Sequence, residues 1–330
     1  MRHSYKDLRY VHSVPMSEPR ACPNGDSGGG PELLEYLTRP TAKAHWWNDP
    51  HSQVLGGRDL QRDIQGTWLG VTKQGRVAVL TNFREHGQNI SGLKSRGGIV
   101  NSFLQTPLDK QETTEQFAKR LVEDEGVSDV GGFSLAFGDL REIVGGKKRS
   151  GLAIVSNRTP DVHGVTWIAE KPGETHGLSN SHYGDLSWPK VVHGEQLLKQ
   201  AIHSNVSRDA GKEDLIARLF DILVVDTLPK RRKGEDWETY INQLRNSIFI
   251  PRIGAATDEQ DPAESIAAAD SEKKVAASDG GYGTQKQTVL LVHQNGHVTF
   301  VEKTLYDEQG KPFGDEEISR FEYDIEGWNG

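Results

Sequence analysis

The sequence has a single cysteine and no long hydrophobic run. Because Cys22 is the only cysteine in 330 residues, an internal disulfide and a zinc site made of several thiolates are both excluded. No run of about 18 apolar residues is present, so we expect no transmembrane helix. The first ten residues are polar and charged without an apolar core behind them, which argues against a secretory signal. These features predict a cytoplasmic protein.

The sequence also has no excess of positive charge. Its formal net charge is −8, so nucleic-acid binding has no general electrostatic support. One basic run occupies residues 230–233, but Pro229 precedes it and Gly234, Glu235 and Asp236 follow it. A solvated loop explains this run better than a nuclear signal or a phosphate-binding patch does.

Two polar segments flank or interrupt an otherwise globular pattern. Residues 1–31 contain several prolines and end in a glycine-rich stretch, which predicts a disordered tail. Residues 256–280 are rich in Ala, Ser, Asp, Glu and Lys, and they predict a disordered insertion in a surface loop. We therefore expect a single domain over residues 32–330 that carries this insertion.

The globular part alternates blocks of strands with blocks of helices. Alternating apolar residues predict antiparallel hairpins, one around Gly75 and one at Asn295 and Gly296. Helical spacing predicts several helices, one of them beginning near Pro189. The predicted strands cover residues 67–72, 76–82, 132–139, 151–157, 165–169, 287–292, 298–303 and 319–324, and the predicted helices cover 99–104, 113–124, 188–202, 213–225 and 237–244. This order indicates an α+β fold.

No cluster of residues identifies a reaction by itself. The histidines lack the spacing of metal ligands, and the serines lack the sequence of a nucleophile elbow. Asparagines follow predicted strands or turns at Asn82, Asn157 and Asn180. Such an asparagine can donate its amide to a developing oxyanion, but more commonly it bonds nearby backbone in a turn. The spacing leaves both interpretations open.

Nine short motifs in a fixed order carry a resemblance to a known family. Each motif is weak alone, but together they extend over nearly the whole globular part of the chain. They occupy residues 39–47, 55–59, 66–71, 80–83, 95–100, 132–135, 177–181, 188–191 and 281–289. On these motifs the chain resembles the Transport and Golgi organization protein 2 family, also called the NRDE family.

The resemblance implies a four-layer αββα sandwich similar to the N-terminal-nucleophile hydrolases. In such hydrolases an N-terminal Cys, Ser or Thr attacks the substrate, its own α-amine is the base, and a strand-end Asn helps to form the oxyanion hole. The matching positions imply a ligand pocket whose candidate residues are Trp68, Asn82, Arg96 and Asn180. Arg96 would bind an anionic group.

The N-terminal sequence departs from the family pattern where catalysis would need it. Position 2 is Arg2 instead of a cysteine, and only Glu35 matches the Asn-Arg-Asp-Glu motif that should precede residue 39. Cys22 lies in polar sequence without a strand pattern. Either the chain is a divergent isoform, or its gene model lacks the true first segment. The second explanation is favoured, because losing central strands would cost more than the roughly 5–15 kcal/mol by which a domain is stable.

Three functional hypotheses follow. The resemblance favours a non-enzymatic factor in Golgi organization and protein secretion that handles haem or acyl lipids, with secretory-pathway proteins as partners. It would be cytoplasmic and peripheral at the Golgi or mitochondria, and haem would be cargo instead of a cofactor. The alternative is an amide hydrolase of the N-terminal-nucleophile type that has lost its nucleophile, or lacks it in this gene model. A third interpretation is an interaction scaffold whose tail and insertion bind partners.

Overall fold

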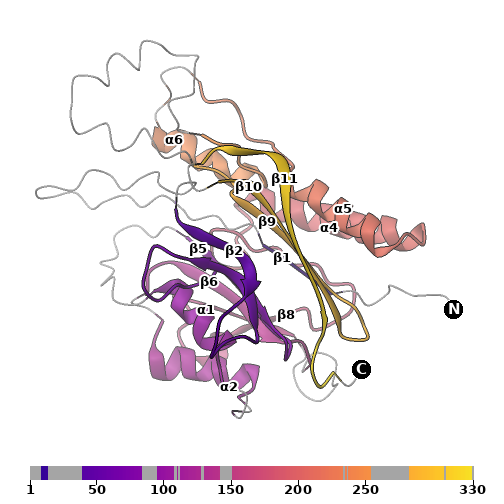
Figure 1. The fold of residues 1–330 in the computed structure, drawn as a ribbon. Coiled ribbons are helices and arrows are strands. Elements are labelled where there is room, and N and C mark those ends of the chain that lie inside the picture. The colour runs from indigo at the N-terminus through magenta and orange to yellow at the C-terminus, as the bar shows by residue number, and fades with distance from the viewer. Residues whose placement is uncertain are drawn as a thin grey trace, which may run out of the picture.

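Two antiparallel sheets form the centre of the molecule, and helices cover their outer faces (Figure 1). The computed structural model describes residues 9–13, 39–83, 95–107, 110, 112–127, 130–141, 151–232, 235, 237–253, 282–307 and 310–328. The seven-stranded sheet has the order β2 (Thr41–Trp46), β3 (Val54–Asp59), β4 (Leu69–Thr72), β5 (Arg76–Asn82), β6 (Phe133–Asp139), β7 (Leu152–Ser156) and β8 (Thr166–Ile168). The four-stranded sheet has the order β1 (Arg9–Ser13), β9 (Lys286–Val292), β10 (His297–Tyr306) and β11 (Pro312–Asp324).

The helices follow the predicted blocks. They are α1 (Arg96–Leu104), α2 (Thr114–Lys119), α4 (Pro189–Ser207), α5 (Lys212–Leu223) and α6 (Trp237–Ile241), with a π-helical turn at Arg120–Glu125 and 3-10 turns at Val162–Gly164 and Asn242–Asn246. The sequence marks two of the helix starts. Thr113 and Gln116 form a capping box at the start of α2, and Pro189 occupies the first turn of α4.

Three apolar clusters define the order of the layers. Phe103 of α1 and Phe117 of α2 pack edge-to-face against Phe137 of β6, with ring centroids about 5 Å apart, on the outer face of the seven-stranded sheet. The inner faces of the two sheets meet through a second cluster of buried side chains, which are mostly aliphatic but include the ring of Phe300. Leu219 of α5 packs against the outer face of the four-stranded sheet. Helix, sheet, sheet and helix therefore follow one another, which confirms the predicted four-layer αββα sandwich.

The two predicted hairpins are present. Strands β4 and β5 pair antiparallel across a turn at Gly75, whose φ of +91° lies in the left-handed region. Strands β9 and β10 pair across the turn that contains Asn295 and Gly296, and Gly296 has a φ of +87°. Both turns use a glycine where an L side chain would be strained, which is why short-range sequence was sufficient to locate them.

The beginning of the chain differs from the prediction. Arg9–Ser13 lies inside the segment predicted to be a disordered tail, but it forms β1, which pairs antiparallel with β9. Tyr10 and Val11 are of residue types that favour strands, and pairing supplies partners for the backbone of β9. The remainder of residues 1–31 and the predicted insertion at residues 256–280 lie outside the described residues.

Three further strands differ from the sequence-based prediction. The strands β2 and β3 were not predicted, and β11 is longer than the predicted strand at residues 319–324.

The adjacent tryptophans Trp46 and Trp47 point to opposite faces of the sheet. The Trp46 ring packs on Tyr323 between the sheets, and Trp47 is buried in the cluster under α1 and α2. None of the helices among the described residues is long and apolar enough to cross a membrane.

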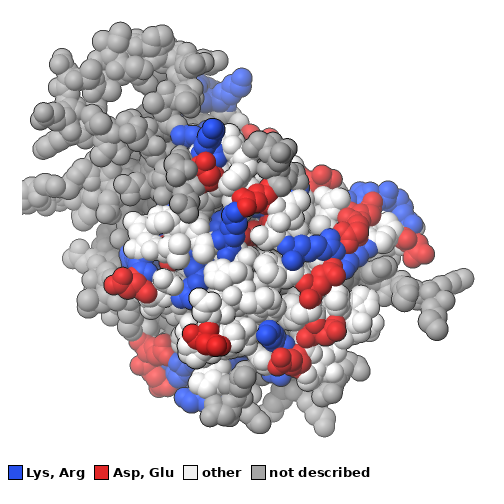
Figure 2. Space-filling model, in the orientation of Figure 1, with Lys and Arg blue, Asp and Glu red and all other residues white. Residues whose placement is uncertain are grey.

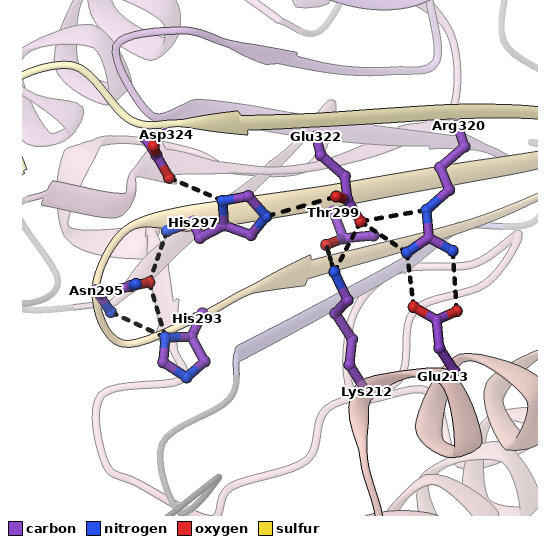
Figure 3. A network of polar contacts seen from close by, with 9 residues as sticks. All are labelled: Lys212, Glu213, His293, Asn295, His297, Thr299, Arg320, Glu322 and Asp324. Atoms are coloured by element: carbon purple, nitrogen blue, oxygen red, sulfur yellow. Dashed lines mark hydrogen bonds and ion pairs between the residues drawn. The ribbon is translucent and has the colours of Figure 1, made fainter. Parts of the chain in front are cut away.

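Charged side chains fasten α5 to the four-stranded sheet (Figure 3). At the start of α5, Lys212 donates to Glu322 of β11 at 2.7 Å, and Glu213 accepts from both terminal nitrogens of Arg320, at 2.7 and 2.9 Å. Hydrogen bonds from Lys212 and Arg320 lower the pKa of Glu322 to about 2. Elsewhere on the face shown in Figure 2, acidic and basic side chains are interspersed.

A buried polar patch interrupts the apolar layer between the sheets. Glu302 of β10 and Lys286 of β9 are only 5% and 7% exposed, and both face β2 of the other sheet. The Glu302 carboxylate accepts a hydrogen bond from Ala44 N at 2.8 Å, and Lys286 Nζ donates to Ala42 O at 2.9 Å. These two side chains therefore join the four-stranded sheet to the backbone of the terminal strand of the seven-stranded sheet.

Burial works against the charge of both groups. It raises the pKa of the Glu302 carboxyl, although the cation of Lys286 acts in the opposite direction. It lowers the pKa of the Lys286 amine, where the Glu302 carboxyl opposes this effect and the Lys43 cation adds to it. Burial therefore shifts each group towards its uncharged form, and the attraction between their charges opposes this shift.

We expect a Glu302→Gln variant to be at least as stable as the wild type at pH 7, because each unit by which burial raises the pKa of Glu302 costs the wild type about 1.4 kcal/mol of stability at high pH. The amide oxygen keeps the bond to Ala44 N. The wild-type carboxyl has a raised pKa in the folded state. Its contribution to the free energy of unfolding is therefore fully present below the pKa of the unfolded chain, and it is lost as pH rises through the pKa of the folded protein. The difference between variant and wild type should therefore shrink as pH falls towards 4, as measured by urea unfolding.

An exposed carboxylate provides the control for this measurement. Glu170→Gln should leave the free energy of unfolding unchanged within about 0.5 kcal/mol at either pH. If Glu302→Gln is markedly less stable than the wild type at pH 7, an ionised Glu302 stabilises the interface, and the assigned direction of its pKa is wrong.

Candidate functional site

Two of the candidate asparagines are in direct contact. Asn82 is the last residue of β5, and Asn180 lies in a loop before α4. The side-chain amide of Asn180 donates a hydrogen bond of 2.8 Å to the main-chain oxygen of Asn82. Both residues are buried, with 6% and 5% exposure. Residues 176–180 form neither helix nor strand, and this bond holds their loop against the end of β5.

The end of β5 carries two buried polar atoms that lack partners. Asn82 Oδ1 and Thr81 Oγ1 accept and donate no hydrogen bond within the part of the chain that the structure describes. Leaving a buried polar atom unpaired costs roughly 1–3 kcal/mol. Rotating the amide of Asn82 by half a turn exchanges its oxygen and nitrogen, so this position offers either an acceptor or a donor to a ligand.

Arg96 approaches the same strand end through a shared backbone oxygen. Its guanidinium donates to Gly132 O at 3.1 Å, and that oxygen also accepts from Phe83 N at 3.0 Å. Only a glycine fits at position 132, because a Cβ atom there would lie 2.2 Å from Phe83 O. The start of α1 is therefore held beside the residue that follows Asn82.

Asn157 and nearby serines hold the backbone in place around this site. Asn157 Oδ1 accepts from Phe133 N at 3.3 Å, so this asparagine bonds backbone, as the commoner interpretation has it, but across from the end of β7 to the start of β6 and not within a turn. Ser134 Oγ donates to Ser181 O at 3.0 Å, and Ser181 Oγ donates to His182 O at 3.3 Å. The Ser134 proton is therefore committed to a carbonyl oxygen, whereas Ser181 also bonds to the carboxylate of Asp185.

Trp68 lies at the same end of the sheet. Its main-chain oxygen accepts from Leu80 N at 2.8 Å, and its half-buried ring packs against the cluster under α1 and α2. The guanidinium of Arg39 lies over the ring, 5.4 Å from its centre, and Arg39 also pairs with Asp59. Asn82, Asn180 and Arg96 are thus linked through one or two backbone groups, whereas Trp68 is their neighbour along the sheet. Their binding roles stay predictions.

A second feature at this end of the sandwich was not found from the sequence. A pocket of about 260 Å³ opens where β2 meets the four-stranded sheet, and Lys286 is among the residues that line it. The only sequence signal is a lysine at an inward-facing position of an apolar strand, because the groups it faces are more than 240 residues earlier in the chain. Within the described residues, no group of three or more His, Cys, Asp or Glu side chains could hold a metal ion.

The layers and the strand-end cluster define the chain as a four-layer αββα protein with a polar site at one end of its sandwich. The sequence profile of the Transport and Golgi organisation 2 family matches residues 35–307. The chain therefore belongs to this family, and the expected resemblance is confirmed.

Relatives are similar over most of their length. The Transport and Golgi organization protein 2 homologue of Homo sapiens is 29% identical over 83% of this chain and 84% of its own, and the homologue of Mus musculus is 27% identical over the same shares. An uncharacterized protein of Saccharomyces cerevisiae is 26% identical over 87% of this chain and 88% of its own. The solved structure of a conjugated bile acid hydrolase from Clostridium perfringens aligns over 82% of this chain and 82% of its own, with 11% identity. The TM-score of this alignment is 0.29, which is too low to support an argument.

We expect Asn180→Ala to lower the free energy of unfolding by about 1–3 kcal/mol, because it removes a partner of the buried Asn82 carbonyl. Chemical denaturation measures this directly. Asn48→Ala is a matched control, since Asn48 is exposed and its replacement should cost less than about 0.5 kcal/mol. Equal losses in both variants would mean that the bond between the loop and the strand end contributes nothing.

Proposed function

We propose that this protein is a non-enzymatic factor in Golgi organization and protein secretion, and that it acts by binding a small ligand. The human and mouse relatives carry the name Transport and Golgi organization, and membership of their family supports the same role here. A cytoplasmic location with peripheral contact at the Golgi or mitochondria, and partners from the secretory pathway, belong to this proposal.

The observation that carries the ligand-binding part is the side-chain oxygen of buried Asn82, which has no hydrogen-bond partner among the residues that the structure describes. A native protein keeps few such groups, so each one calls for a specific reason. A ligand that bonds to the Asn82 amide would offset the cost of burying it. The neighbouring guanidinium of Arg96 favours a ligand with a carboxylate or a polarised carbonyl. Haem, through its propionates, and acyl-CoA, through its thioester and phosphates, have these groups.

The hydroxyl groups at the site support binding over turnover. A serine or threonine nucleophile needs a base that accepts its proton. Ser134 donates its proton to a main-chain oxygen, and Thr81 Oγ1 has no hydrogen-bond partner within the described residues. Ser181 bonds to His182 O and also to the carboxylate of Asp185, whose lowered pKa makes it a weak base. The placement of Asn82 beside Asn180 does favour an alternative, an amide hydrolase of the N-terminal-nucleophile type. In that reading the Asn82 amide would donate to the oxyanion, and turnover of a fatty-acyl amide would overturn the non-enzymatic proposal.

We expect haem or palmitoyl-CoA to raise the melting temperature of the wild-type protein. A ligand at a hundred times its dissociation constant stabilises the folded state by about 2.7 kcal/mol. Asn82→Ala should lose most of the shift, because it removes the amide that faces the ligand. Asn48→Ala should keep the shift, because Asn48 is exposed. No shift with either ligand, or an undiminished shift in Asn82→Ala, would contradict binding at this site.

In cells, we expect loss of this protein to slow the secretion of a reporter enzyme and to fragment the Golgi. Expression of the wild type should restore both, and Asn82→Ala at equal abundance should restore neither, because ligand binding is the proposed activity. The Asn48→Ala variant serves as the positive control. Normal secretion and Golgi morphology without the protein would refute the proposed role and leave the binding measurement valid.

A further inference from the structure

The pocket between the sheets combines two lysine amines, one carboxyl group and aromatic side chains. It lies where β2 meets the starts of β9 and β11 and the end of β10, and it has a volume of about 260 Å³. The residues that line it are Thr41, Lys43, Gln285, Lys286, Thr304, Tyr306, Asp307 and Phe313. The ring of Phe313 is 37% exposed, and the Lys43 ammonium lies over it at 5.7 Å from its centre. The volume suits a small organic molecule.

The two lysines of this pocket have different surroundings. Lys43 forms an ion pair with Glu317, and its side chain is 43% exposed. Lys286 is 7% exposed, and within the described residues its Nζ donates to the neutral carbonyl of Ala42. No carboxylate lies within ion-pair distance of Lys286 among the described residues, since Glu302 is its diagonal neighbour across the β9–β10 pair.

The surroundings of Lys286 favour an amine without a proton. Burial is the largest influence, and it lowers the pKa of this side chain, with the Lys43 cation acting in the same direction against Glu302. An ordinary lysine with a pKa near 10.4 is almost wholly protonated at pH 7, and each unit by which the pKa falls raises the neutral fraction about tenfold. A neutral lysine amine in a pocket is a nucleophile towards carbonyl compounds.

We propose that Lys286 is a reactive amine that forms an imine with a small aldehyde or ketone bound in this pocket. The lone pair of Nζ forms a bond to the carbonyl carbon as the carbon–oxygen π bond breaks. Both amine protons end on the oxygen, which leaves as water, and a carbon–nitrogen double bond remains. No oxidant, reductant or metal takes part. Phe313 and Tyr306 provide an apolar and aromatic surface for the rest of the ligand.

This site uses residues other than the asparagine cluster, so it goes beyond the proposed function. A purely structural role is the competing explanation, because Lys286 also caps Ala42 O of β2. The two explanations differ in one measurable property. A lysine that only caps the strand would react with aldehydes more slowly than an exposed lysine, since it is buried and hydrogen-bonded.

The test is reductive trapping with butanal and sodium cyanoborohydride on the full chain at pH 7. Peptide mass spectrometry gives the rate of labelling at each lysine in one sample. We expect Lys286 to be labelled at least tenfold faster than Lys199, an exposed lysine of α4. Labelling at Lys286 that is equal to or slower than that at Lys199 would overturn the proposal, as would labelling confined to Lys43 in the same pocket.

Two variants separate the reactivity of the Lys286 amine from any effect of a mutation on folding, because Lys199 is measured in the same sample. Lys286→Arg keeps a donor for Ala42 O but cannot form an imine, so the fast label should disappear while the label at Lys199 persists. Glu302→Gln removes the carboxyl that favours the protonated amine, so labelling of Lys286 should become faster still. If Glu302→Gln slows the reaction of Lys286 while leaving Lys199 unchanged, the amine is not activated in the way proposed.

Discussion

The joining of the two sheets at β2 is the constraint on which the rest of the structure depends. β2 ends the strand order of the seven-stranded sheet, so one of its edges has no strand beside it among the described residues. Glu302 and Lys286 reach across from the other sheet and bond to its backbone. Such bonds fix how the sheets are offset, and they satisfy backbone groups of β2 where its pairing with β3 is irregular, between Ala42 and His45. The cost is a pair of ionisable groups in a layer that is otherwise apolar.

Local sequence was sufficient for the parts of the fold whose contacts are local. The hairpins at Gly75 and Gly296, the capping box of α2 and the proline at the start of α4 are each set by residues close together in the chain. The strand β3 was missed because Gly56 and Gly57 weaken its pattern. The structure gives these glycines a reason, because a Cβ atom on Gly56 would lie 2.6 Å from Leu69 O of the neighbouring strand.

For the candidate site, too, the sequence predicted individual residues but not the contacts between distant parts of the chain. Asn82 and Asn180 stand out at the ends of short apolar runs, and their association was expected only through the family resemblance. Their contact spans 98 residues, so spacing alone contains no sign of it. The bonds of Glu302 and Lys286 to β2 span 258 and 244 residues. In the sequence these two residues look like ordinary charged positions of a half-exposed hairpin, and only the facing sheet makes them buried.

Antiparallel pairing explains why both polar sites lie at one end of the sandwich. One end of the seven-stranded sheet is formed by the start of β2, the end of β3, the start of β4 and the end of β5. The residues at this end include Thr41, Asp59, Trp68 and Asn82. Strand ends leave backbone groups that no ladder satisfies, so asparagine amides, hydroxyls and charged side chains collect there. At the β2 corner the same edge meets Lys286 and Thr304 of the other sheet. At the β2 corner, polar side chains of both sheets therefore replace the apolar packing that fills the rest of the cluster between them.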